Sequence, residues 1–108
     1  MNIEKTKIVG VSFDNRQEHI KDINDMVDEL VAVREPKNPY DKNAIHIYIK
    51  TEDGQTTDDM KSCGYINRHL AKDLAPLMDD GKELIVQNYY ITGNGNSSLG
   101  VMIEYSLE

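Results

Sequence analysis

The sequence has little cysteine: one residue, Cys63, in a chain of 108. A single thiol excludes an internal disulfide and gives a zinc site almost no ligands. The three histidines are scattered without metal-ligand spacing, so we expect no metal and no cofactor. No apolar run is long enough to span a membrane, and the start MNIEKTK lacks the apolar core of a signal peptide. We therefore expect a cytoplasmic protein without membrane contact.

Basic residues are also scarce. The chain has 12 Lys and Arg but 19 Asp and Glu, which gives a net charge of −7. This balance argues against a protein that coats nucleic acid along its length, since such binding depends on neutralised phosphates. The charge is uneven, however, and residues 34–50 hold more basic than acidic side chains. A positive local field is therefore compatible with the acidic total.

Length and composition favour one soluble globular domain over residues 1–108, because 39% hydrophobic content is too high for a disordered chain. The clearest strand is 44–50, where Ile45, Ile47 and Ile49 alternate with polar residues and should face the core. On the opposite face, His46 is expected to lie in solvent. Further strands are predicted at residues 7–13, 29–35, 62–66, 84–92 and 99–107.

Two helices are expected between these strands. Asn15 followed by Glu18 is typical of a capping box, and the helix should continue through Ile23. Asn67 should cap a second helix, in which Leu70, Leu74 and Met78 share one face, Pro76 introduces a kink and Gly81 ends the helix. Turns are expected at residues 51–59 and 93–96. Six short strands and two helices predict a small, mainly antiparallel barrel.

No constellation of residues indicates an enzyme strongly. Cys63 is best interpreted as a small buried residue, and the glycine-rich segment at 93–96 lacks the Lys-Ser/Thr of a phosphate loop. Paired acids at 58–59 and 79–80 are interpreted as solvated charges. The chain contains no obvious nucleophile and base at a recognisable spacing.

The segment Asn38–Asn43 (NPYDKN) has two interpretations. It is an ordinary turn if Asn38-Pro39 bends the chain and Asp41 bonds to nearby backbone. It is a binding site if Pro39 holds the ring of Tyr40 outward, beside Asp41, Lys42 and the basic residue Arg68. A carboxylate there would repel an internal phosphate but accept a hydrogen bond from a free hydroxyl, which suits the end of a strand.

Three stretches carry a resemblance to a known family: VGVSF at 9–13, VREPKNPYDKNAIHIY at 33–48 and CGYINRHLAKDLAPLMDDG at 63–81. In this order and spacing they resemble the HIRAN domain, found in helicase-like transcription factor and as a free-standing bacterial protein. The resemblance implies a six-stranded OB- or SH3-like barrel that binds the 3′-hydroxyl end of single-stranded DNA, in the context of stalled-fork remodelling and DNA repair. It implies no motor and no zinc here, because the motifs for both are absent.

The resemblance also implies roles for individual residues. Phe13 and Tyr40 would stack on the two faces of the terminal base. Asp41 would accept a hydrogen bond from the 3′-hydroxyl, and Asn38 would shape the pocket. Ser12 stands where the DNA-binding relatives have an arginine, so one phosphate contact is missing. Together with local chemistry, the resemblance gives eight candidate nucleic-acid-binding residues: Ser12, Phe13, Asn38, Tyr40, Asp41, Lys42, Tyr65 and Arg68.

Two alternatives remain open from the sequence. The acidic composition and the missing arginine are compatible with a protein-interaction or small-ligand module that uses the same pocket. A hydrolase is the more remote alternative, with Asp41 as its catalytic acid.

Overall fold

The protein is a mainly β structure with two helices, as the sequence predicts. The computed structural model describes residues 2–51, 59–93 and 98–108. One sheet has the order β1-β6-β5 and the other β2-β3-β4, and all neighbouring strands are antiparallel. The strands are β1 (Glu4–Lys7), β2 (Glu29–Arg34), β3 (Ile45–Lys50), β4 (Lys61–Tyr65), β5 (Leu84–Thr92) and β6 (Gly100–Leu107). The helices are α1 (Arg16–Lys21) and α2 (Arg68–Asp79).

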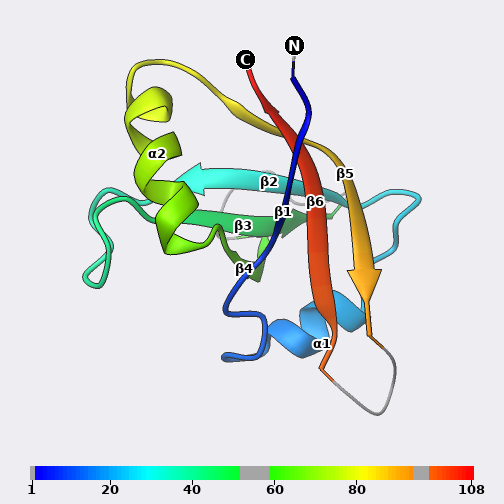
Figure 1. Ribbon diagram of the computed structural model, residues 1–108. Helices are drawn as coiled ribbons and strands as arrows, with labels where there is room; N and C mark the ends of the chain where they lie inside the picture. Colours follow the sequence, from blue (N-terminus) through cyan, green and yellow to red (C-terminus); the bar gives the residue numbers. More distant parts are fainter. Residues whose placement is uncertain (1, 52–58, 94–97) are drawn as a thin grey trace.

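The two sheets cross each other steeply, and the chain ends lie side by side where β1 pairs with β6 (Figure 1). After β1 the chain passes from one sheet to the other, since Ile8 donates to Val101 of β6 and Val9 pairs with Tyr65 of β4. No continuous ladder closes the sheets into a barrel within the described residues, so the closed barrel stays a prediction. Of the two turns predicted at 51–59 and 93–96, residues 52–58 and 94–96 lie outside the described residues.

The core confirms the predicted register of β3. Ile45, Ile47 and Ile49 are 0–1% exposed, at the centre of the core cluster. The prediction for His46 is wrong, because this side chain is only 7% exposed. Its ring is stacked between Tyr48 and Tyr65, so the outer face of β3 is covered as well.

The predicted first strand at 7–13 is also wrong. The strand occupies residues 4–7, and Gly10, with φ +73°, starts a tight turn into α1. The amide of Phe13 donates to the carbonyl of Gly10, and the amide of Arg16 donates to the carbonyl of Phe13. Ser12 and Phe13 therefore lie exposed on a turn instead of in a sheet.

The caps of the helices match the sequence signals in part. Asn67 caps α2, since its Oδ1 accepts from the amide of Leu70 at 2.9 Å, and the helix continues past Pro76 to Asp79. Gly81 follows the helix end with φ +106°, as expected for a C-terminal glycine. By contrast, α1 begins after Asn15 without a side-chain cap and ends at Lys21, before the predicted Ile23. Within the described residues, neither helix has the length and apolarity needed to cross a membrane.

Candidate functional site

A pocket of about 470 Å³ lies where the loop before β3 meets the end of β4 and the start of α2. Five of the eight predicted site residues line it, together with residues that the sequence analysis missed. The lining comprises Val9, Arg16, Asn38, Pro39, Tyr40, Asp41, Ala44, Tyr65, Ile66 and Arg68. Ser12, Phe13 and Lys42 are exposed outside this lining.

The loop at 38–43 is held by its own side chains, which confirms the turn. Asn38 Oδ1 accepts from the amides of Tyr40 at 2.9 Å and Asp41 at 3.2 Å. Asp41 Oδ1 in turn accepts from the amide of Asn43 at 2.9 Å. With this backbone fixed, the side chain of Tyr40 projects into solvent and is 86% exposed. The turn therefore presents an aromatic ring at the edge of the pocket.

The carboxylate of Asp41 faces a cation across the pocket. Its Oδ2 lies 3.7 Å from Arg68 Nε, beyond ordinary hydrogen-bond distance. Arg68 is anchored by a hydrogen bond of 2.7 Å from Nη2 to the carbonyl of Tyr40. The half-buried Asp41 thus keeps acceptor capacity on Oδ2, and Arg68 keeps donors for a second anion.

Arg16 brings a second, buried cation into the pocket wall. Its side chain comes from the first turn of α1, and the residue is only 9% exposed. Nη1 donates to the carbonyl of Gly10 at 2.7 Å, and the guanidinium carbon lies 5.3 Å from the centroid of the Tyr65 ring. This distance is typical of a cation–π contact. The sequence signalled no role for Arg16, because the turn that brings α1 against β4 was interpreted as a strand.

Comparison with known proteins identifies the family. The family model of the HIRAN domain matches residues 5–108. The chain belongs to the HIRAN domain family. A solved structure of a protein from Lactobacillus plantarum is 22% identical, with a TM-score of 0.61 and 99% of each chain covered. The HIRAN domain of human HLTF is 24% identical, with a TM-score of 0.56, covering 96% of this chain and 74% of that chain. None of the curated proteins matches the chain.

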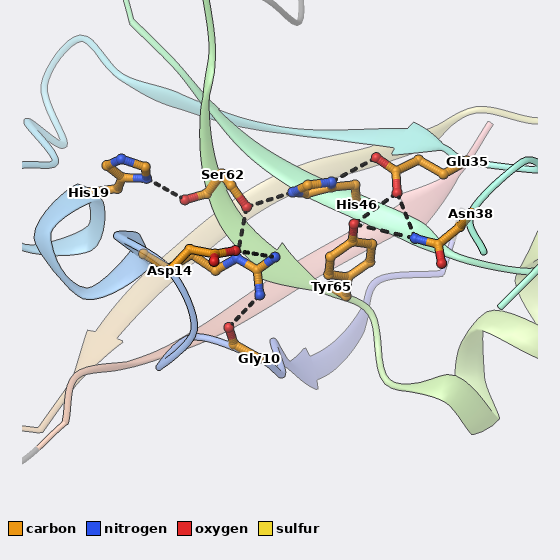
Figure 2. A network of polar contacts seen from close by, with 9 residues as sticks. Gly10, Asp14, His19, Glu35, Asn38, His46, Ser62 and Tyr65 are labelled. Carbon is orange, nitrogen blue, oxygen red and sulfur yellow. Dashed lines mark hydrogen bonds and ion pairs between the residues drawn. The ribbon is translucent and has the colours of Figure 1, made fainter. Parts of the chain in front are cut away.

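Two residues that line the pocket, Arg16 and Tyr65, belong to a network of buried and partly buried polar groups in this HIRAN domain, which includes Glu35, His46 and Ser62 (Figure 2). His46 Nδ1 lies 2.8 Å from Glu35 Oε2, and His46 Nε2 lies 2.6 Å from Ser62 Oγ. Ser62 Oγ also accepts from Arg16 Nε at 2.9 Å. These contacts are consistent with a neutral His46 that carries its hydrogen on Nδ1. In this tautomer Nδ1 donates a hydrogen bond to Glu35, and Nε2 accepts one from the hydroxyl of Ser62.

Glu35 connects this polar network to further residues of the pocket. Its Oε1 accepts from the hydroxyl of Tyr65 at 2.8 Å and from Asn38 Nδ2 at 3.1 Å. Burial raises the pKa of Glu35, but hydrogen bonds from Asn38, His46 and Tyr65 outweigh burial and lower the pKa overall. Burial and the nearby Glu35 raise the pKa of Tyr65 to about 12, so its hydroxyl remains a donor. Hydrogen bonds to Glu35 therefore hold Asn38 and Tyr65, two of the residues that line the pocket, in place.

The order Glu35, His46, Ser62 matches that of a carboxylate–histidine–serine triad. In this HIRAN domain the serine oxygen already accepts a hydrogen bond from Arg16, and Ser62 does not line the pocket. We therefore assign the three residues to positioning Arg16 and Tyr65. Cys63, next in sequence, is buried as predicted, and burial raises the pKa of its thiol to about 12.

The polar network predicts that the free energy of unfolding decreases on acidification. Burial is the main cause that lowers the pKa of His46 below its ordinary value of 6.5. Between the folded pKa and about pH 6.5 the unfolded state therefore binds more protons than the folded state, so the free energy of unfolding falls as pH decreases through this range. The lowered pKa of Glu35 adds a further loss below about pH 4.5.

Urea denaturation at pH 7, 6 and 5 measures this loss. In the variant His46→Gln, the free energy of unfolding should be lower at pH 7 but should change less between pH 7 and pH 5. His69→Gln, which changes an exposed histidine on α2, serves as the control. Its free energy of unfolding should change with pH as much as that of the wild type. If the free energy of unfolding of His46→Gln changed with pH as much as that of the wild type, the assignment of a neutral His46 would be contradicted.

Proposed function

We propose that this HIRAN domain binds the 3′-hydroxyl end of single-stranded DNA in the pocket beside Tyr40. The observation that carries the proposal is the position of Asp41, a carboxylate with free acceptor capacity, next to an exposed aromatic ring and a cation. Membership of the HIRAN family supports a nucleic-acid ligand. The role proposed is binding and not catalysis.

Tyr40 supplies the surface for the terminal base. An exposed ring on a loop fixed by proline and two side-chain hydrogen bonds loses little conformational freedom when a base stacks on it. Phe13 is 68% exposed on the turn before α1 and provides a second aromatic face near the pocket. Arg68, which is largely exposed at the rim, is suited to contact the phosphate backbone.

Asp41 distinguishes an end from the middle of a strand. An internal nucleotide would place a phosphate near this carboxylate, and the two anions repel each other. A terminal 3′-hydroxyl instead donates a hydrogen bond to the carboxylate, and a charge-assisted bond of this kind contributes ~1.5–3 kcal/mol. The same group therefore disfavours continuous strands and favours free ends.

The test compares one labelled oligonucleotide carrying either a 3′-hydroxyl or a 3′-phosphate. We expect the hydroxyl end to bind at least roughly tenfold more tightly, which corresponds to about 1.4 kcal/mol. Asp41→Asn should reduce this preference more than it reduces affinity for the phosphorylated end, because Asn keeps the bond to the amide of Asn43. Asp25→Asn, an equal charge change on an exposed residue outside the pocket, should retain the preference.

Equal affinity for both ends, or no binding at low salt, would contradict end recognition. Either result would favour the second candidate, a protein-interaction or small-ligand module. The observation favouring that candidate is the exposure of two aromatic rings, Tyr40 and Phe13, on a protein with a net charge of −7.

A further inference from the structure

We propose that Arg16 forms a phosphate-binding site in the pocket, which takes the 5′-phosphate of a nucleotide whose 3′-hydroxyl reaches Asp41. The inference deepens the proposed function and rests on it for the choice of a nucleotide as ligand. It defines the smallest ligand of the pocket as a nucleoside 5′-monophosphate with a free 3′-hydroxyl.

The hydrogen-bonding capacity of Arg16 is only partly used. A guanidinium has five N–H donors. Nε donates to Ser62 Oγ at 2.9 Å and Nη1 donates to the carbonyl of Gly10 at 2.7 Å. Nη2 has its nearest acidic partner, Asp14 Oδ2, at 3.8 Å, which is too far for a hydrogen bond. Among the described residues, five donors minus two bonds therefore leaves three N–H groups without a hydrogen-bond acceptor.

Such a cation is costly to bury unless an anion pairs with it. Arg16 is 9% exposed, whereas the side chain of Asp14 is 84% exposed and screened by water. The pocket therefore holds a largely buried guanidinium whose nearest carboxylate, that of Asp14, lies 3.8 Å from Nη2. The unbonded Nη2 still reaches solvent, since no fully buried side-chain nitrogen among the described residues lacks a hydrogen-bond partner. A phosphate oxygen entering the pocket would satisfy the free donors and the charge together, and the planar fork of arginine matches phosphate geometry.

The guanidinium is also held in one orientation. Ser62 fixes Nε, Gly10 fixes Nη1, and the guanidinium carbon lies over the ring of Tyr65, 5.3 Å from its centroid. A cation fixed before binding loses little side-chain entropy when the anion arrives. Arg16 is thus better suited to a specific phosphate contact than the exposed lysines of this acidic surface.

The same pocket places the two ends of one nucleotide against groups of opposite charge. Arg16, Tyr40 and Asp41 all line it. Arg16 is suited to the 5′-phosphate, Tyr40 to the base and Asp41 to the 3′-hydroxyl. This complementarity defines the ligand without any contact to a neighbouring nucleotide.

The experiment compares thymidine with thymidine 5′-monophosphate, in chemical-shift titrations of the ¹⁵N-labelled protein. We expect the monophosphate to bind at least fivefold more tightly to the wild type. Arg16→Gln should abolish this difference, and Lys21→Gln, which removes an exposed charge from the same helix, should retain it.

Asp14→Asn provides a second test that does not depend on the folding of an Arg16 variant. Asp14 has φ +54°, a conformation that asparagine also adopts readily, and its side chain is exposed, so the fold should be retained. This substitution removes the one carboxylate that is paired with Arg16 among the described residues. We expect two- to fivefold tighter binding of the monophosphate, unchanged binding of thymidine, and no such gain in Asp25→Asn.

The outcomes separate this inference from the proposed function. If the 3′-hydroxyl oligonucleotide binds but thymidine and its monophosphate bind equally, the Arg16 site is wrong and end recognition stands. If the monophosphate binds through Arg16 but the oligonucleotide does not bind, the phosphate site stands and DNA-end recognition is wrong. Unchanged monophosphate affinity in Asp14→Asn would also overturn the Arg16 site.

Discussion

Replacing Gly64 with alanine is expected to destabilise this HIRAN domain by about 2–6 kcal/mol. Gly64 has φ +155°, and a Cβ there would lie 2.5 Å from the carbonyl oxygen of Val9 and 2.7 Å from Cγ2 of Ile8. Backbone strain contributes ~1–3 kcal/mol and steric overlap another ~1–3 kcal/mol. This loss is large compared with a typical domain stability of about 5–15 kcal/mol.

Gly81→Ala separates the two contributions. Gly81 also has a positive φ, +106°, but a Cβ there would meet nothing within 4 Å. Alanine at Gly81 therefore introduces strain without overlap and should destabilise less than alanine at Gly64. Urea denaturation measures both variants, and equal losses of unfolding free energy would show that the close approach of Val9 to Gly64 is unimportant.

The second large effect is expected for Tyr40→Ala. Loss of a stacked base should weaken binding of a 3′-hydroxyl oligonucleotide by ~1–3 kcal/mol, which corresponds to roughly 5- to 150-fold in affinity. The melting temperature should change little, because Tyr40 is 86% exposed and therefore buries little surface in the folded protein. Fluorescence anisotropy and thermal unfolding of the same samples measure the two quantities.

Tyr40→Phe is the matched control for this variant. It keeps the aromatic face and removes only the hydroxyl, so its affinity should remain close to that of the wild type. A lower melting temperature with unchanged affinity in Tyr40→Ala would show instead that Tyr40 stabilises the loop and does not contact the ligand.

Local sequence signals predicted the parts of the molecule that local physics determines. Alternation placed Ile45, Ile47 and Ile49 in the core, because the two faces of a strand follow directly from its period of two. Asn67 as a cap and Asn38 as the organiser of a turn were equally predictable, since both side chains bond to backbone within three residues. Tyr40 and Asp41, singled out from the same local segment, both line the pocket, and their role in binding stays a prediction.

The errors concern contacts between distant segments. His46 was placed in solvent, but Tyr65, 19 residues away, covers it, and Glu35 and Ser62 bond its two nitrogens. Arg16 was overlooked because its role depends on contact with Ser62 and Tyr65, on a different element. Gly10 could have signalled the turn, since a glycine within an apolar run often marks a break in a strand.

The internal hydrogen bonds of Asn38 and Tyr65, which line the pocket beside Tyr40, have a consequence for sequence preference. Asn38 accepts from two backbone amides through Oδ1 and donates to Glu35 through Nδ2, and the hydroxyl of Tyr65 donates to the same carboxylate. Both side chains therefore use most of their hydrogen-bonding capacity inside the protein, including a contact of 3.5 Å from Asn38 Nδ2 to the hydroxyl of Tyr65, and should contribute little to reading the edge of a base. If the pocket binds DNA ends, any preference for adenine, guanine, cytosine or thymine at the last position should come from its charged side chains, which keep free acceptors or donors, and not from Asn38 or Tyr65.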